Sequence, residues 1–429
     1  MSQLEKIKVA LLGAGNVGAQ VARILTEDAD LMSQRIGVPA ELVGIAVRDV
    51  DAPRQVDIDP QLLTTDADAL IDQADVVIEL TGGIEPARTR ILRALRAGKP
   101  VVSGNKALLA QHGVELQTAA NESGVQLSFE AAVAGAIPIL RPLRDSLAGD
   151  KITRVLGIMN GTTNFILDQM HTHGAEFEDA LAQAQELGYA EADPTADVQG
   201  YDAASKAAIV ASLAFHSEFS IDDVHCEGIT AITADDVKAA EEDDFVIKLL
   251  AICEQDGDGV NIRVNPTLVP RKHPLASVHE AYNAVFVQAE NAGELMFYGP
   301  GAGGAPTASA VMGDFVSLAR RLVLGGAGVP ESNHAHLKST AMAGVFSRFS
   351  ISLKVSDKLG VLASITKVFA EHGVSIQTMR QSRPSSSEFS LIRIVTHRAK
   401  DSDLRKTMAG LDSLDIVQSI ISVIRVEGE

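Results

Sequence analysis

Cysteine is scarce in this sequence and tryptophan is absent: 429 residues contain two cysteines, Cys226 and Cys253. Two cysteines far apart give neither a disulfide framework nor a C-x-x-C metal motif, so we expect a protein of the reducing cytoplasm. With four tyrosines and thirteen phenylalanines, the hydrophobic cores must be built mainly from aliphatic side chains.

Positive charge is also in short supply. The 37 Lys and Arg residues are outnumbered by 56 Asp and Glu, and the formal net charge of -19 repels nucleic acids and anionic membrane surfaces. No apolar run approaches the ~18 residues of a membrane span, and the N-terminus lacks the apolar core of a signal peptide. We expect no nucleic-acid partner and no membrane association. A phosphate-bearing ligand would need a local site of backbone N–H groups and one or two cations.

The chain length predicts two or three domains. Apolar runs at 7–12, 42–47, 75–80, 100–103 and 125–129 alternate with helical stretches, which predicts a Rossmann-like, doubly wound parallel α/β sheet over residues 1–135. Ala-rich helices mixed with strands over 136–304 predict an α+β substrate and dimerisation domain. The apolar helix expected at 305–323 follows a glycine-rich break and could pack back on the first domain.

Glycines and a proline mark residues 324–348 as a linker. After Arg348 the pattern reads strand, helix (361–372), strand, strand, helix (402–411), strand. That order predicts a ferredoxin-like βαββαβ domain over residues 349–429.

A glycine-rich motif follows the first expected strand: Gly13-Ala14-Gly15-Asn16-Val17-Gly18 fits G-x-G-x-x-G. The first glycine permits the turn, the second lets a diphosphate approach the backbone, and the third lets helix and strand pack closely. The alternative is a glycine turn that binds no nucleotide. After the second strand, Arg48 suits the 2′-phosphate of NADP and Asp49 suits the free ribose of NAD, so we favour NADP while dual use stays open.

The densest group of polar residues lies at 186–206, where five carboxylates and one lysine border an apolar helix. Asp202 and Lys206 are four residues apart and share a helix face, where a lysine beside an acid can be tuned for acid/base work. The alternative is a surface loop with a capping Asp and an ordinary salt bridge.

This segment resembles the signature of the homoserine dehydrogenases, through Ala184-x-x-x-Gly188-Tyr189-Ala190 and Asp193-Pro194-x-x-Asp197-Val198-x-Gly200-x-Asp202-x-x-x-Lys206. The resemblance continues at 105–106, 129–138, 157–164 and 299–304, so it spans both expected dehydrogenase domains. It implies reduction of L-aspartate 4-semialdehyde to L-homoserine with NAD(P)H, a step in threonine, methionine and isoleucine biosynthesis.

The resemblance also implies residue roles. Lys206 would donate the proton to the carbonyl oxygen and Asp202 would orient it or bind the substrate hydroxyl. Glu191 would hold the substrate α-ammonium, Asp197 would support the same pocket, and Lys106 would touch both substrate and cofactor unless it is a solvated loop lysine. The implied cofactor-binding residues are Gly13, Gly15, Asn16, Val17, Gly18, Arg48, Thr81, Lys106 and Gly303.

A monovalent cation, sodium, is implied as well. Its ligands would be Glu130 and the backbone carbonyls of Val133, Gly135 and Ile137, an all-oxygen set that suits a hard cation. Glu130 could equally be a strand-end acid paired with an arginine.

The C-terminal unit resembles an ACT domain at 357–362 and 373–376. The resemblance implies an amino-acid effector, L-threonine acting as feedback inhibitor, at Asp357, Gly360, Val374 and Ile376. Paired ACT units would make the protein a homo-oligomer, a dimer or tetramer. The alternative is a dimerisation module without a ligand.

Two other functions stay open. A phosphorylating semialdehyde dehydrogenase would share the cofactor domain but needs a cysteine nucleophile, and neither cysteine lies in a recognised motif. A non-catalytic amino-acid sensor would use the nucleotide domain as a scaffold and the C-terminal unit as its receptor.

Overall fold

The computed structural model describes residues 4–54, 56–326, 333–382 and 389–428. The chain divides into two compact units, each assembled from three segments. Unit 1 comprises Met1–Val155, Ser205–Asp223 and Tyr282–Leu337, and unit 2 comprises Leu156–Ala204, Val224–Ala281 and Lys338–Glu429. Within the described residues, no helix is long and apolar enough to cross a membrane.

Unit 1 is built on a six-stranded parallel sheet of order β3-β2-β1-β4-β5-β6. This is the doubly wound sheet that the alternating pattern predicts. Its central strands are almost wholly buried, because helices cover both faces. The strands are β1 (Ile7–Leu12), β2 (Ala40–Ala46), β3 (Leu63–Thr64), β4 (Val76–Glu79), β5 (Val101–Ser103) and β6 (Leu127–Ser128).

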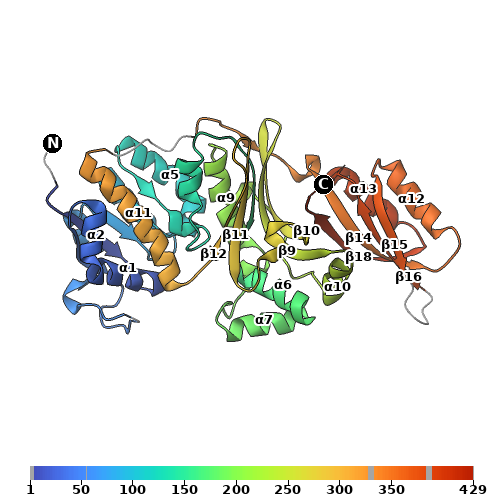
Figure 1. The fold of residues 1–429 in the computed structure, drawn as a ribbon, viewed down its shortest axis with the longest axis horizontal. Coiled ribbons are helices and arrows are strands. Elements are labelled where there is room, and N and C mark those ends of the chain that lie inside the picture. Colours follow the sequence, from blue (N-terminus) through green and yellow to red (C-terminus); the bar gives the residue numbers. More distant parts are fainter. Residues whose placement is uncertain (1–3, 55, 327–332, 383–388, 429) are drawn as a thin grey trace. The chain divides into compact units, whose positions relative to one another are not determined.

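Helix α11 (Gly304–Leu324) lies in unit 1 although it is encoded far from the sheet. It packs against α1 and α2 (Figure 1). Phe315 is fully buried in the same apolar cluster as Val9 and Val21. The other helices of the sheet layer are α1 (Asn16–Glu27), α2 (Ala29–Ile36), α3 (Ala67–Gln73), α4 (Ala87–Arg96) and α5 (Lys106–Glu122).

Unit 1 also contains the antiparallel hairpin of β11 (Tyr282–Ala289) and β12 (Gly293–Pro300). Strand β11 is buried for most of its length, whereas β12 is partly exposed. The strand β7 (Ile152–Ile158) and the helix α9 (Tyr201–Ala214) run from one unit into the other.

The first part of unit 2 combines helices with a long antiparallel pair, β9 (Phe245–Asp256) and β10 (Gly259–Pro270). A short strand, β8 (His225–Cys226), pairs with β10 in parallel. The helices are α6 (Gly161–His173), α7 (Phe177–Glu186), α8 (Thr195–Val198) and α10 (Ala234–Glu242). Helix and strand are mixed here as the sequence predicts for the substrate region.

The C-terminal part of unit 2 has the expected βαββαβ order: β14 (Phe346–Ser356), α12 (Val361–Glu371), β15 (Ile376–Ser382), β16 (Phe389–Thr396), α13 (Asp401–Asp412) and β18 (Val417–Val426). The sheet order is β10-β18-β14-β16-β15, with β10 and β18 paired in parallel at Thr267–Arg425 and Leu268–Val426. The expected linker holds short elements, β13 (Lys338–Ser339) and the start of β14, and its residues 327–332 lie outside the described residues. Strand β17 (Ala399–Lys400) pairs with β14.

Candidate active site

The glycine-rich loop lies between β1 and α1, and its three glycines differ in their surroundings. A Cβ on Gly13 (φ +99°) would lie 2.8 Å from the carbonyl oxygen of Leu80, and one on Gly18 would lie 2.1 Å from that of Gly13. A Cβ on Gly15 would meet nothing within 4 Å. Gly15 is also the N-cap of α1 and offers no side-chain cap. The open space and the first N–H groups of α1 fit a diphosphate.

A buried carboxylate organises the adjacent loop after β4. Glu79 is fully buried and accepts hydrogen bonds from the N–H and hydroxyl of Thr81, at 2.8 and 2.6 Å. The hydroxyl of Ser103, at the end of β5, donates to its other oxygen at 2.9 Å. Glu79 therefore fixes Thr81 at the carboxyl edge of the sheet, where open α/β sheets bind ligands. No local sequence pattern points to Glu79, because its partners are on a separate strand and in a loop.

Lys106 and Arg48 lie at this same carboxyl edge of the sheet. Lys106 is the first residue of α5 and is exposed, and Asn105 caps that helix through Leu108 N–H while donating to Gly83 O at 2.7 Å. Arg48 is exposed directly after β2. The neighbouring Asp49 accepts a hydrogen bond from Asp51 N–H at 2.9 Å.

The turn at 133–137 has an unusual backbone. Ala134 and Gly135 both have positive φ, 55° and 58°, a strained arrangement for alanine. Within the described chain, no backbone hydrogen bond reaches the carbonyl oxygens of Val133, Gly135 or Ile137, although all three residues are buried. Buried carbonyls in such a turn are suitable cation ligands.

Glu130 holds the start of the turn that contains these carbonyls. Its carboxylate accepts from Ile139 N–H and Leu140 N–H at 2.6 and 2.8 Å, and from Arg141 N–H and Nε at 2.7 and 3.2 Å. Four donors fill the lone-pair positions of a carboxylate. The pairing with an arginine that the sequence left open is thus present. Arg141 Nε also lies 3.4 Å from Asp314, whose pKa is raised to about 7 by burial, with a further contribution from the negative charge of Glu130.

The glycine-rich loop at 299–304 lies against both the phosphate-binding loop and the turn at 133–137 within unit 1. A Cβ on Gly304 would lie 2.8 Å from Asn16 O in the phosphate-binding loop. A Cβ on Gly135 would lie 2.4 Å from Gly301 O, and Ala136 N–H donates to Pro300 O at 3.2 Å. Gly303 (φ +118°) therefore lies beside the start of α1.

In unit 2, an asparagine joins two of the expected site carboxylates. The side-chain nitrogen of Asn160 donates to Asp197 Oδ1 at 2.6 Å and to Asp202 Oδ2 at 2.9 Å. Asn160 caps α6, Asp197 lies on α8, and Asp202 is in the first turn of α9. Asn160 lies in a stretch of the resemblance, but the sequence alone assigned it no role.

Asp202 and Lys206 are both on α9, 7% and 8% exposed, so this acid and this lysine are buried one helical turn apart. Burial of both charged groups is rare outside functional sites or structural ion pairs. Glu191 lies in the loop after α7 and is exposed. Its backbone carbonyl accepts a hydrogen bond from Gln185 Nε2 at 3.1 Å.

The loop 226–229 packs closely against the segment that contains Asp197 and Asp202. A Cβ on Gly228 would lie 2.3 Å from Val198 O, and one on Gly200 (φ +84°) would lie 3.0 Å from Cys226 Sγ. Ile229 N–H donates to Val198 O at 2.8 Å. Movement of this loop must therefore displace the backbone between the two acids.

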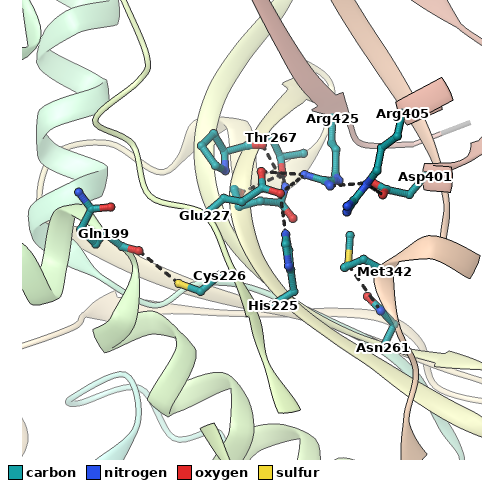
Figure 2. A network of polar contacts seen from close by, with 12 residues as sticks. Gln199, His225, Cys226, Glu227, Asn261, Thr267, Met342, Asp401, Arg405 and Arg425 are labelled. Atoms are coloured by element: carbon teal, nitrogen blue, oxygen red, sulfur yellow. Dashed lines mark hydrogen bonds and ion pairs between the residues drawn. The ribbon is translucent and has the colours of Figure 1, made fainter. Parts of the chain in front are cut away.

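The loop 226–229 is in turn tied to the C-terminal part of unit 2 (Figure 2). Glu227 accepts two hydrogen bonds from Arg425 Nη1, at 2.8 and 2.9 Å, and lies 2.6 Å from His225 Nε2. Arg425 Nη2 donates to Asp401 at 2.9 Å, and Asp401 also accepts from Arg405 at 2.6 Å. Burial alone would raise the pKa of Glu227, but His225 and Arg425 outweigh it and lower that pKa to about 2.

Neither cysteine has the surroundings of a nucleophile. Burial raises the pKa of Cys253 to about 12 and that of Cys226 to about 11, and the Cys226 thiol donates to Gln199 O at 3.2 Å. A raised pKa suppresses the reactive thiolate. The geometry therefore argues against chemistry that needs a cysteine nucleophile.

The expected effector residues lie at two loops of the C-terminal part. Asp357 is exposed after β14 and accepts from Ser390 Oγ at 3.2 Å, and Gly360 (φ +90°) is the N-cap of α12. Val374 is 3% exposed and belongs to the apolar core, so its side chain supports the fold. Ile376 begins β15 and is half-buried.

Comparisons with known proteins agree with this architecture. Family models described as homoserine dehydrogenase, NAD binding domain, as homoserine dehydrogenase, and as ACT domain match residues 13–130, 138–316 and 349–413. The homoserine dehydrogenase of Corynebacterium glutamicum is 52% identical over 98% of this chain and 96% of its own.

Solved structures give the same result. A homoserine dehydrogenase from Thiobacillus denitrificans superposes with a TM-score of 0.90, at 38% identity and 98% coverage of both chains. A hyperthermophilic archaeal homoserine dehydrogenase in complex with NADPH has a TM-score of 0.62 at 27% identity, covering 73% of this chain and 97% of its own. The chain therefore belongs to the homoserine dehydrogenase family, oxidoreductases with an NAD-binding domain, and it carries a C-terminal ACT domain.

Proposed function

We propose that this homoserine dehydrogenase reduces L-aspartate 4-semialdehyde to L-homoserine with NADPH as the preferred hydride donor, in the biosynthesis of threonine, methionine and isoleucine. The observation that carries the proposal is the buried polar group formed by Asp202 and Lys206 on α9, with Asp197 joined to Asp202 through Asn160. A bound reduced nicotinamide supplies the hydride to the carbonyl carbon.

Lys206 acts on the oxygen of the same carbonyl. As the carbon is reduced, its oxygen gains negative charge, and the Lys206 ammonium donates a proton that completes the hydroxyl. Asp202, one turn earlier on the helix, orients the ammonium and accepts from the new hydroxyl. Water exclusion around these buried groups strengthens the interaction of charge with charge.

The substrate amino group needs a fixed anion. Glu191, exposed in the loop after α7, is free to approach the α-ammonium, and Asp197 adds charge to the same segment. Lys106 at the carboxyl edge of the parallel sheet supplies a cation to the substrate or cofactor. These assignments follow the family resemblance at those positions.

NADPH is preferred in the proposal because Arg48 is an exposed cation directly after β2, where the adenosine ribose of a dinucleotide lies. The archaeal relative crystallised with NADPH supports this choice. Gly13, Gly15, Asn16, Val17 and Gly18 would hold the diphosphate, and Thr81 and Gly303 would line the cofactor.

A monovalent cation, sodium, fits the turn at 133–137. The carbonyls of Val133, Gly135 and Ile137, which accept no backbone hydrogen bond within the described parts of the chain, would be its ligands. Because the carboxylate of Glu130 is already filled by four N–H donors, it would contribute negative charge and hold the turn in place.

Feedback inhibition by L-threonine through the ACT domain completes the proposal, with Asp357, Gly360, Ile376 and the backbone of Val374 around the effector. The contacts of Glu227 with Arg425 support it, since they connect the ACT part with the loop behind Asp197 and Asp202. The protein would be a homo-oligomer. Residues 417–424 of β18 have no β10 partner among the described residues, and Ile421 and Val423 are exposed there, which suits pairing with a second copy.

The test follows nicotinamide absorbance with purified protein, aspartate semialdehyde, and NADPH or NADH in parallel. The Lys206→Met variant should lose roughly 10²- to 10⁴-fold in kcat while binding NADPH normally. Lys367→Met, which removes a lysine 75% exposed on α12, is the matched control and should retain full activity. A wild-type protein that oxidises neither cofactor, or a Lys206→Met variant with unchanged kcat, would contradict the proposal.

A further inference from the structure

Asn160 has a side-chain orientation that its surroundings fix. Its Oδ1 accepts from the N–H of Thr163 at 2.8 Å and lies 3.0 Å from the hydroxyl of Thr163. Because Oδ1 must face these donors, the NH₂ group must face the other way. Asn160 itself is 5% exposed, so water does not compete for either end.

The NH₂ group faces two carboxylates and has one hydrogen for each. The distances are 2.6 Å to Asp197 Oδ1 and 2.9 Å to Asp202 Oδ2. Rotating the amide by 180° would place its carbonyl oxygen against both carboxylates, so Thr163 keeps the donor end in place. Every hydrogen-bonding position of the side chain is thereby used.

We infer that Asn160 is a positioning residue of the reaction, whose amide group holds the carboxylates of Asp197 and Asp202 at a fixed separation and orientation. The inference rests on the proposed function, which gives these two acids their roles. It adds a residue that acts through both acids without touching the substrate.

The physical need for such a residue comes from charge. Two ionised carboxylates close together repel each other and turn toward solvent unless a donor lies between them. With Oδ2 of Asp202 bonded to Asn160, the orientation of that carboxylate is restricted. A preorganised acid spares the reaction the cost of ordering it.

A helix cap alone would explain only half of the contacts. The cap of α6 uses Oδ1 and Thr163 N–H, and serine or aspartate performs that task about as well as asparagine. The two bonds from the NH₂ group are additional. Substitutions that keep the cap and remove the donor therefore separate the two roles.

Asn160→Ser and Asn160→Asp are the test variants. Both keep a capping oxygen. In Asn160→Ser the thermal midpoint and the NADPH dissociation constant should stay close to wild type, whereas Asn160→Asp should lower the thermal midpoint, because its charge is buried against two carboxylates. Without the charge-assisted donor, kcat in Asn160→Ser should fall roughly 10- to 100-fold, and Asn160→Asp should lose more because it adds a third negative charge. Thr163→Val, which loses the hydroxyl contact but keeps the N–H, should show a smaller loss.

A double-mutant cycle with Asp197→Asn supplies the decisive readout. If Asn160 acts through Asp197, that substitution should cost less in the Asn160→Ser background than in wild type. Additive effects, or wild-type kcat in both Asn160 variants, would overturn the inference while wild-type turnover still upheld the proposed function. Absence of turnover in the unmodified enzyme would instead overturn the proposed function itself.

Discussion

The guanidinium of Arg425 and the carboxylate of Glu227 join the last strand of the chain to the loop directly behind the two acids of the site. Nη1 of Arg425 contacts both oxygens of Glu227, at 2.8 and 2.9 Å, and the side chains are 13% exposed for the arginine and 42% for the glutamate. The contact joins a buried guanidinium to a partly exposed carboxylate, and removing one partner would leave the other without its counter-charge. We therefore expect a rearrangement of β18 in unit 2 to displace the loop 226–229 through this contact.

Arg425→Gln should weaken the response to threonine. Because the change breaks the contact between the ACT part and the loop but leaves the site residues in place, turnover without threonine should change less than about twofold, whereas the threonine concentration for half inhibition should rise at least about fivefold. Steady-state inhibition curves with NADPH measure both quantities.

Arg405→Gln is the matched control, since Arg405 bonds Asp401 and is 65% exposed. It should leave the threonine curve close to that of wild type. Equal shifts in the two variants would argue for general damage to the ACT part, and an unshifted Arg425→Gln curve would exclude this contact from the coupling.

Glu227 should also make the stability of unit 2 depend on acid pH. Its folded pKa of about 2 lies below the ordinary glutamate value of 4.5, so its contribution is fully present above about pH 4.5 and is lost as pH falls toward 2. Glu227→Gln should therefore show a shallower fall of the thermal midpoint over that window. Scanning calorimetry from pH 2 to 6 tests this, and parallel curves for the two proteins would contradict it.

Arg48 should decide the choice between the two cofactors. Arg48→Ser removes the exposed cation after β2, so the KM for NADPH should rise roughly 10- to 100-fold while the KM for NADH changes little. Asp49→Asn is the complementary variant and should affect NADH more than NADPH. If Arg48→Ser raised the KM values for NADPH and NADH equally, Arg48 would not be the residue that recognises the 2′-phosphate.

The phosphate-binding glycines provide a matched pair. Gly18→Ala places a methyl group 2.1 Å from Gly13 O, so it should lower the free energy of unfolding by about 1–3 kcal/mol. Gly15→Ala meets no atom within 4 Å and should fold normally, but its methyl group would occupy the diphosphate space and raise the NADPH dissociation constant at least about tenfold. Thermal denaturation and cofactor fluorescence distinguish the two, and normal NADPH binding by Gly15→Ala would contradict this placement of the diphosphate.

The sequence predicts the parallel sheet, the glycine-rich loop and the βαββαβ order because these depend on local patterns. Apolar runs, turn glycines and helix periodicity are each contained in a dozen residues or fewer. Asp202 and Lys206 could be paired in advance for the same reason, since one helical turn separates them. The family resemblance also favoured an enzyme over a non-catalytic sensor, and the comparisons confirm the oxidoreductase.

Other contacts depend on topology that no local pattern contains. Glu79 is hydrogen-bonded to Ser103, which lies on the neighbouring strand. Asn160 is hydrogen-bonded to Asp202, which lies 42 residues later in the sequence. Glu227 is hydrogen-bonded to Arg425, which lies 198 residues later in the sequence. No local pattern predicts the four donors on Glu130 either, because they come from residues 139–141, which lead into a short helical segment at Pro142–Ser146.

The position of α11 has a consequence for synthesis on the ribosome. The apolar surface formed by α1, α2 and β1 is covered by a helix that ends at residue 324 of 429. Until that helix emerges, the nascent six-stranded sheet exposes part of its core, including the site where Phe315 will insert. Such a surface is prone to aggregation and attracts chaperones. A ribosome stalled before α11 should therefore carry a sheet whose strands are paired but whose uncovered apolar surface is prone to aggregation.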